Sequence, residues 1–356
     1  MLVVGAGEAG QALVEQMRRE PELGLEPVGF VDDDPELVGS EVAGLPVQAR
    51  THELIEAAGE LAADEILIAI PSARGSVIRR LLLLCKRARL PFRIVPGLQA
   101  IIEGDVRFNQ VRTVAPEDLL GRETVRFQAD AARSVVAGRS IMVTGAGGSI
   151  GGELCRQLIA LAPAELLLLG RGENSVFEIM GELASLRGDV RLVPLIADVR
   201  DRERLLVLAG RHRPHLVLHA AAHKHVPLME DHPEEAVAVN AGGTANLIEF
   251  AREVDAERFV LISTDKAAEP TSVMGATKKL AELLVRHAHQ EGADTRFMTV
   301  RFGNVLGSRG SVVPFFLDRI AAGQPLPVTH PEMTRYFMTI REAAQLVIEA
   351  MVLGEA

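Results

Sequence analysis

The sequence Ser140-Ile-Met-Val-Thr144-Gly-Ala-Gly-Gly-Ser-Ile-Gly151 decides the fold of the chain that carries it. Its first five residues predict a buried strand, a glycine-rich turn follows, and a helix is expected to run to about residue 161. Glycines in such a turn allow the backbone to approach a pyrophosphate, and the amides at the start of the helix attract it. The turn therefore predicts a dinucleotide site formed by Gly145, Gly148, Ser149, Ile150 and Gly151.

The same order of strand, glycine turn and helix occurs at the start of the chain. Residues 2–4 predict a strand, Gly5-Ala-Gly7-Glu-Ala-Gly10 a turn, and the residues up to about 19 a helix. Further strands are expected at residues 27–31, 65–70 and 92–95 of this copy, and at residues 165–169, 191–196, 215–219, 258–263 and 296–301 of the other. Helical patterns between them, such as residues 234–254 and 271–290, predict an α/β fold with two tandem Rossmann-like, doubly wound parallel sheets.

This alternation suggests how the chain divides into domains. We expect an N-terminal Rossmann-like domain at residues 1–125, a linker at residues 126–138, and a nucleotide-binding domain at residues 139–356. The glycine turn of the first copy is weak evidence for a ligand by itself. Asp32 or Asp33 could hold ribose hydroxyls there, or could only form a turn and cap a helix.

Composition excludes several classes of protein. A net charge of −10 over 356 residues argues against a nucleic-acid partner. Cys85 and Cys155 form neither a disulfide framework nor a metal-binding spacing, which fits a reducing, cytoplasmic compartment. No apolar run reaches the length that spans a bilayer. The chain nevertheless begins directly on a buried strand and stops just past an apolar helix, so we expect both ends to be cut from a longer protein.

Residues after the strands of the second copy bear on the choice of cofactor. An NAD site places an acid after the second strand, whereas an arginine there suits the 2′-phosphate of NADP. Gly170-Arg171 follows this strand, which favours NADP, although Glu173 could still reach the ribose. Asp198 is expected near the adenine, or as a helix cap. The wall of the expected cofactor site is completed by Val199, Ala220 and Ala221.

Lysine placement marks a candidate active site. The 38 basic residues comprise 33 arginines and only five lysines, three of which fall within residues 266–279. Arginine replaces lysine where only charge is needed, but not where an amine must exchange a proton. Thr264, Asp265 and Lys266 end one strand, and Met274 and Lys278 then share one face of a helix. Chance retention of these lysines is the alternative, and Lys279 is expected to be solvated.

These motifs resemble the extended short-chain dehydrogenase/reductase superfamily, in which a Tyr-x-x-x-Lys helix faces a Ser or Thr. Within it, the second half looks most like the large, membrane-associated UDP-N-acetylglucosamine 4,6-dehydratases of capsule, O-antigen and glycan biosynthesis. That group typically has methionine in place of the tyrosine, as at Met274. The stretches that carry the resemblance are residues 144–151, 219–230, 240–244, 263–266, 274–278 and 301–314.

The resemblance implies a lyase with an internal redox cycle. Bound NAD(P)+ takes hydride from sugar C4, water is lost across C5 and C6, and hydride returns to C6. By position, Lys266 is the base at C5, Asp265 the acid at C6, and Thr264 the hydrogen-bond partner of the C4 oxygen. Lys278 would hold the nicotinamide ribose. Methionine has no exchangeable proton, so the acceptor of the C4 hydroxyl proton stays open, with Asp265 acting through water as a candidate.

The resemblance also implies a substrate and its surroundings. We expect His225, Asn304, Arg309 and Arg335 to bind a UDP-N-acetylhexosamine, with the last three facing its diphosphate, although exposed arginines often form only surface ion pairs. No metal site is expected from His219, His223 and His225, because no acidic partner is suitably spaced. A homo-oligomer is implied, with membrane attachment through segments outside this chain and a position at the cytoplasmic face of the plasma membrane.

Other functions remain open from the sequence. A UDP-sugar 4-epimerase is one rival, although epimerases ordinarily use the tyrosine that is missing here. A dehydratase that also inverts C5 is a closer rival, and a non-catalytic nucleotide-binding regulator is a third. The choice between NAD and NADP, the sugar epimer and the ligand of the first domain are left undecided.

Overall fold

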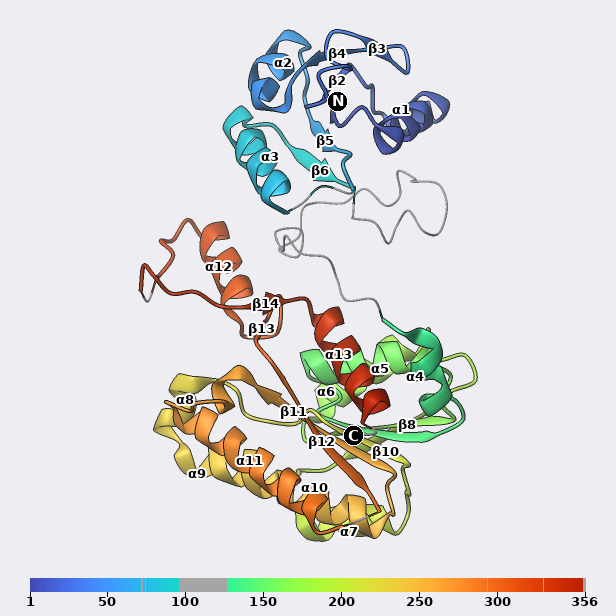
Figure 1. Ribbon diagram of the computed structural model, residues 1–356, viewed down its shortest axis with the longest axis vertical. Coiled ribbons are helices and arrows are strands. Elements are labelled where there is room, and N and C mark those ends of the chain that lie inside the picture. Colours follow the sequence, from blue (N-terminus) through green and yellow to red (C-terminus); the bar gives the residue numbers. More distant parts are fainter. Residues whose placement is uncertain (72, 74, 96–126, 293, 329, 355–356) are drawn as a thin grey trace. The chain divides into compact units, whose positions relative to one another are not determined.

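The computed structural model describes residues 1–71, 73, 75–95, 127–292, 294–328 and 330–354. The chain divides into two compact units, Met1–Glu123 and Thr124–Ala356, which are described separately (Figure 1). Residues 96–126, which include the expected end of the first domain at residue 125, lie outside the described residues, so the domain limits stay a prediction.

The first unit contains a six-stranded sheet in the order β3-β4-β2-β1-β5-β6, with β3 antiparallel to β4 and the other pairs parallel. Its strands are β1 Leu2–Val4, β2 Gly29–Val31, β3 Glu41–Val42, β4 Leu45–Ala49, β5 Ile66–Ile68 and β6 Phe92–Ile94. Its helices are α1 Glu8–Arg19, α2 Leu54–Glu60 and α3 Gly75–Ala88. Leu2 and Val4 pack with residues of α2 and α3, whereas Val3 between them packs with α1. This alternation buries both faces of the sheet.

The second unit contains a fully parallel sheet in the order β12-β11-β10-β7-β8-β9. Its strands are β7 Ser140–Thr144, β8 Glu165–Gly170, β9 Arg191–Ile196, β10 Leu216–His219, β11 Arg258–Thr264 and β12 Arg296–Phe302. Numbered along the chain, they follow the Rossmann order 3-2-1-4-5-6. The order reverses between β7 and β10, which is where ligands bind in such sheets. The predicted fold class is therefore confirmed in both units.

Helices cover both faces of this second sheet (Figure 1). One face is covered by α4 Ala129–Val136, α5 Ser149–Ile159, α6 Glu173–Ala184 and α13 Ile340–Leu353. The other is covered by α7 Arg202–Ala209, α10 Gly243–Glu253 and α11 Val273–Gln290. Helix α4 lies within the stretch expected to be a linker. Its Ala132 and Val136 are buried in the core of the unit because they lie four residues apart, on one helix face.

One departure from the expected pattern concerns the helix predicted after β10. The single helix predicted at residues 234–254 consists of α9 Pro233–Ala236, the π-helix Val237–Gly242 and α10. Such π segments often occur at functional sites. The other elements of this unit include α8 Val226–Asp231, α12 Val312–Ala321 and the two-stranded sheet of β13 Asn304–Val305 and β14 Phe337–Met338. In the part of the chain that the structure describes, no helix combines the length and apolarity needed to cross a membrane.

Candidate active site

The glycine turn between β7 and α5 is shaped by close backbone contacts. Gly145 has a φ of +66°, a left-handed conformation that favours glycine. A Cβ added to Gly151 would lie 2.2 Å from the carbonyl oxygen of Gly145, so no side chain fits there. Gly148 is the N-cap of α5 and supplies no capping side chain, which leaves the first amides of the helix available to an anion.

A cavity of about 230 Å³ opens beside this turn. It is bounded by residues at or just after the ends of β7, β8, β9 and β10, and by Val239 of the π-helix; the strand order reverses between β7 and β10. Seven of the expected cofactor residues line it: Gly145, Gly148, Arg171, Asp198, Val199, Ala220 and Ala221. Ser149, Ile150, Gly151 and Lys278 are not among its lining residues. The sequence interpretation missed others that are: Leu169, Gly170, Ala197, Ala222, His223 and Val239.

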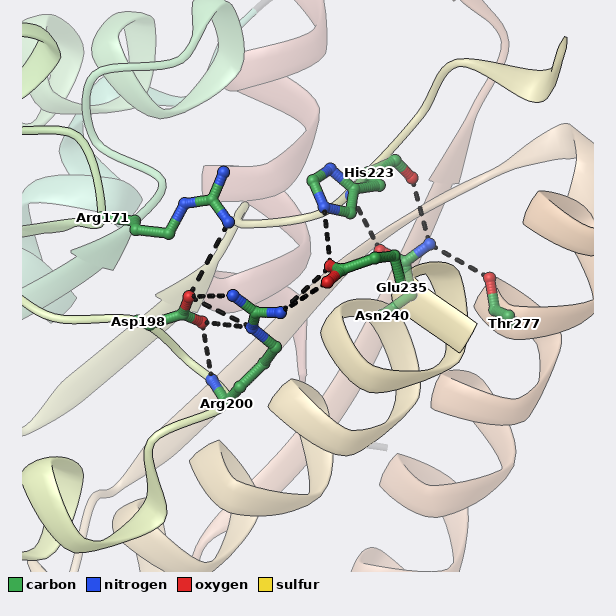
Figure 2. A network of polar contacts seen from close by, with 7 residues as sticks. All are labelled: Arg171, Asp198, Arg200, His223, Glu235, Asn240 and Thr277. Atoms are coloured by element: carbon green, nitrogen blue, oxygen red, sulfur yellow. Dashed lines mark hydrogen bonds and ion pairs between the residues drawn. The ribbon is translucent and has the colours of Figure 1, made fainter. Parts of the chain in front are cut away.

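Polar side chains at one side of the cavity form a network (Figure 2). Arg200 donates to both carboxylate oxygens of Asp198, at 2.7 Å from Nη2 to Oδ2, and Nη1 reaches Glu235 at 2.9 Å. The hydrogen bonds from Arg200 lower the pKa of Asp198. Arg171 approaches Asp198 only to 3.8 Å and its side chain is 62% exposed. Asp198 is thus held by Arg200, while Arg171 remains accessible beside the cavity.

His223 connects this network to the π-helix (Figure 2). Its backbone N–H donates to Asn240 Oδ1 at 2.8 Å, and Asn240 Nδ2 donates to the carbonyl of His223 at 3.0 Å and to Thr277 Oγ1 at 3.0 Å. Burial and the nearby Arg171 lower the pKa of His223, whose ring lies 3.8 Å from Glu235. His223 belongs to the motif at residues 219–230, but the sequence alone did not predict that it lines the cavity.

His219 holds the ends of β7 and β10 together. The Thr244 hydroxyl donates its only proton to the carbonyl of Asn240 at 2.6 Å, so it accepts from His219 Nε2–H at 3.1 Å. His219 Nδ1 then accepts from the Thr144 hydroxyl at 2.8 Å. Burial lowers the pKa of His219 to about 3, and the ring is neutral. These bonds place the proton of the neutral His219 ring on Nε2 and give the residue a structural role next to the cavity.

The segment after β11 brings three expected site residues together. The Thr264 hydroxyl donates to Asp265 Oδ1 at 2.8 Å, and Lys266 Nζ donates to the same oxygen at 3.1 Å. Lys266 Nζ also donates to Asn304 Oδ1 at 3.2 Å. Partial burial raises the pKa of Asp265, but hydrogen bonds from Thr264 and Lys266 outweigh it and lower the pKa overall. Asp265 is therefore ionised in this arrangement, the opposite of what the expected acid at C6 requires.

Lys278 lies on α11, next to the strand β11 that ends in this segment. It is 5% exposed, and its Nζ donates to the carbonyl of Ile262 at 2.6 Å. Burial lowers its pKa to about 8. Met274, one turn earlier, is 3% exposed and packs with Met229 and Ala236. The methionine thus fills an apolar contact between α8, α9 and α11, and the lysine stays close to the end of β11.

A second charged group supports the same helix and was missed from the sequence. Glu282, one turn beyond Lys278, is 8% exposed and accepts from Ser263 Oγ at 2.6 Å and from Arg301 Nε at 2.7 Å. Burial opposes its ionisation, yet the bonds from Arg301 and Ser263 outweigh burial and lower its pKa. The charged Glu282 fixes α11 against β11 and β12.

The structure distributes the four expected substrate residues over different places. Asn304 contacts Lys266. Arg309 lies on the glycine turn, where its backbone N–H donates to Ser149 Oγ at 2.9 Å and its Nη1 to the carbonyl of Gly147 at 3.0 Å. His225 lies against the loop that carries Arg309, since a Cβ on Gly310 would be 2.6 Å from its ring. Arg335 donates to the carbonyl of its neighbour Thr334 at 2.7 Å. Within the described ranges, no three His, Cys, Asp or Glu residues are placed to hold a metal ion.

The parallel sheet, the glycine turn with its cavity, and the Thr-Asp-Lys segment facing a buried helix lysine define a nucleotide-binding protein of the extended short-chain dehydrogenase/reductase class. Residues 141–356 match the polysaccharide biosynthesis protein family, and the chain belongs to that family. Residues 1–96 match a family described as a CoA-binding domain.

Individual relatives extend this assignment. The chain is 46% identical to the probable polysaccharide biosynthesis protein EpsC of Bacillus subtilis, over 99% of its own length and 59% of that protein's. It is 37% identical to a UDP-N-acetylglucosamine 4,6-dehydratase (inverting) of Campylobacter jejuni, over 59% of its own length and 63% of that protein's. A solved structure of DesIV, a dTDP-glucose 4,6-dehydratase from Streptomyces venezuelae with NAD and TYD bound, is 26% identical, with a TM-score of 0.53 over 61% of this chain and 73% of that one. The chain thus spans less than two thirds of the length of the curated relatives named here.

Proposed function

We propose that this chain is the catalytic portion of a nucleotide-sugar 4,6-dehydratase that acts on a UDP-N-acetylhexosamine. The observation that carries the proposal is the contiguous Thr264-Asp265-Lys266 at the end of β11, joined by contacts of 2.8 and 3.1 Å. An epimerase requires no such acid and base side by side. Support comes from a relative named as a UDP-N-acetylglucosamine 4,6-dehydratase.

We infer that the cavity holds part of a nicotinamide dinucleotide. Gly145 and Gly148 line it, present no side chains of their own and would hold the pyrophosphate. When bound, the dinucleotide supplies the hydride acceptor for C4 and the hydride donor for C6. We favour NADP, because Arg171 stands beside the cavity with only a 3.8 Å contact to Asp198, and a 2′-phosphate would be a stronger partner. NAD, which is bound in the DesIV structure, is the alternative.

The proposed acid and base must change their protonation when substrate arrives. Lys266 and Asp265 form an ion pair, with side chains 35% and 41% exposed. A sugar that covers them would remove water, and loss of water favours the neutral forms of both groups. Lys266 would lose its proton to solvent and give a neutral amine that can accept the C5 proton, and Asp265 would become the carboxylic acid that protonates the C6 hydroxyl once it has taken up the proton of the C4 hydroxyl. The substrate itself would then complete the active protonation state.

The remaining side chains position the sugar and its oxygen. The Thr264 hydroxyl is proposed to donate to the C4 oxygen, in place of its bond to Asp265. Lys278 is proposed to hold the nicotinamide ribose and to favour the C4 alkoxide by its charge. Met274 is buried in an apolar contact and has no proton to exchange. Asp265, through water, is the proposed acceptor of the C4 hydroxyl proton before it becomes the acid.

One assay separates the candidate functions. The protein is incubated with UDP-N-acetylglucosamine and NADP+ or NAD+ in heavy water, and the product is analysed by mass spectrometry and NMR. Loss of one water with deuterium at C5 is expected, and the C5 configuration tells a retaining from an inverting dehydratase. A 4-epimer without loss of water would exclude the dehydratase, and nucleotide binding without turnover would favour a regulator.

A further inference from the structure

The loop between β13 and α12, residues 306–311, is attached to the cofactor side of the site; we call it the strap. Arg309 donates to Ser149 Oγ at 2.9 Å and to the carbonyl of Gly147 at 3.0 Å. Lys224, which follows the cavity wall after β10, donates from Nζ to Ser308 Oγ at 3.3 Å. These contacts tie the strap to the glycine turn and to the exit of β10.

The strap has a fixed shape of its own. The Ser308 hydroxyl donates to the carbonyl of Val305 at 3.0 Å, and the N–H of Ser311 donates to the carbonyl of Ser308 at 2.9 Å. Gly307 and Gly310 have φ values of +68° and +65°, conformations that favour glycine. Arg309 is therefore presented to the glycine turn by an ordered loop.

The guanidinium of Arg309 has hydrogen-bonding capacity that its present contacts do not use. It carries five N–H donors in a planar fork. One donates to Gly147, and the nearest carboxylate, Glu178, is 3.6 Å away with both side chains more than 60% exposed. A diphosphate seated on the adjacent amides of α5 would offer paired oxygens to this fork, which is the geometry that arginine binds best.

We propose that Arg309 binds the pyrophosphate of the nicotinamide dinucleotide and that the strap retains the cofactor, instead of facing the diphosphate of the sugar nucleotide. The inference rests on the proposed function, whose reaction gives it a purpose. Hydride taken from C4 must be returned to C6 of the same sugar. If the reduced cofactor dissociated between these two steps, the reaction would stop at the 4-ketone. Slow release of the dinucleotide therefore helps each turnover to reach completion, whereas the sugar nucleotide must bind and dissociate in every cycle.

The test compares Arg309→Gln with Arg139→Gln in the full chain. Arg139 is a matched control because it is also an exposed arginine paired with a glutamate, Glu257 at 2.6 Å. It precedes β7, so it lies at the amino end of that strand, whereas the glycine turn follows the carboxyl end. Each protein is loaded with radiolabelled NADP+ or NAD+, release is timed in excess unlabelled nucleotide, and UDP affinity is measured by calorimetry on the loaded protein. Arg309→Gln is expected to release the dinucleotide about 10- to 100-fold faster, the loss typical of hydrogen bonds to a charged group, with UDP affinity unchanged.

Each other outcome contradicts the inference in a different way. Weaker UDP binding with unchanged dinucleotide release would assign Arg309 to the substrate. No change in either would leave it a surface residue. Equal acceleration in Arg139→Gln would point to a general loss of stability. If the unaltered chain binds no nicotinamide dinucleotide, the proposed function itself fails, which the wild-type measurement reveals separately.

Discussion

Replacing Lys278 with methionine removes a buried ammonium from the second unit. The side chain is 5% exposed, and burial lowers its pKa from the ordinary value of 10.5 to about 8. Each tenfold change in proton affinity is worth about 1.4 kcal/mol, so the charged form costs the fold about 3 kcal/mol at pH 7. Methionine removes this cost but also removes the hydrogen bond from Nζ to the carbonyl of Ile262, which lowers the stability of the variant by about 1–2 kcal/mol. Lys278→Met should therefore be more stable than the wild type at pH 7 by about 1–2 kcal/mol, while losing turnover.

The advantage of the variant should depend on pH with a defined sign. Below pH 8 the lysine is charged in both the folded and unfolded chains, so the cost of burial is fully present. Between pH 8 and 10.5 the unfolded chain binds more protons at this residue, and wild-type stability rises with pH. The gap between Lys278→Met and the wild type should close across that window.

Differential scanning calorimetry from pH 7 to 10 measures both effects. A gain of this size corresponds to a melting temperature about 2–8 °C higher for a unit of this length. Lys279→Met is the matched control, because it makes the same change one residue along at a half-buried position, where an effect within about 0.5 kcal/mol is expected. A destabilised Lys278→Met at pH 7, or a stability gap that does not change with pH, would refute the reasoning.

Three further substitutions test other parts of the site. Lys266→Arg should keep nucleotide binding and lose turnover, and near-normal turnover would remove Lys266 from the base role. Gly151→Ala should abolish nucleotide binding and lower the melting temperature, since its Cβ would lie 2.2 Å from Gly145 O; Gly181→Ala, whose Cβ meets no atom within 4 Å, should not. Arg171→Ala should weaken NADP+ binding about tenfold or more in equilibrium titrations and leave NAD+ unchanged, and an equal loss for both would contradict a 2′-phosphate contact.

Much of the fold could be predicted because it depends on local patterns. Strands at residues 2–4, 140–144 and 191–196 lie where they were expected, since short apolar runs bounded by glycine turns have few alternatives. The short strands β3 and β4 were missed, because Glu41–Val42 and Leu45–Ala49 contain no continuous apolar run. The π-helix was missed because its pattern matches that of an ordinary helix, and buried Asn240 becomes evident only through its three hydrogen bonds.

The candidate site was predictable only in part, for a similar reason. Thr264, Asp265 and Lys266 are neighbours along the chain, so their proximity follows from the sequence. His223 and Glu282 depend on partners that are distant in sequence, and no local pattern predicts such pairs. Arg309 illustrates the limit most clearly, because its contacts with Gly147 and Ser149 span 162 and 160 residues.

The sequence by itself determined the class of fold, the glycine turn, the Thr-Asp-Lys segment and the family resemblance, because each is written in neighbouring residues. Tertiary structure decided the protonation of the ionisable side chains in the site and their hydrogen-bond partners. Burial lowers the pKa of Lys278, and hydrogen bonds from Thr264 and Lys266 keep Asp265 ionised. It also decided that Arg309 lies on the glycine turn. Electrostatic and hydrogen-bonding environments depend on which segments the fold brings together, and a linear pattern does not contain that information.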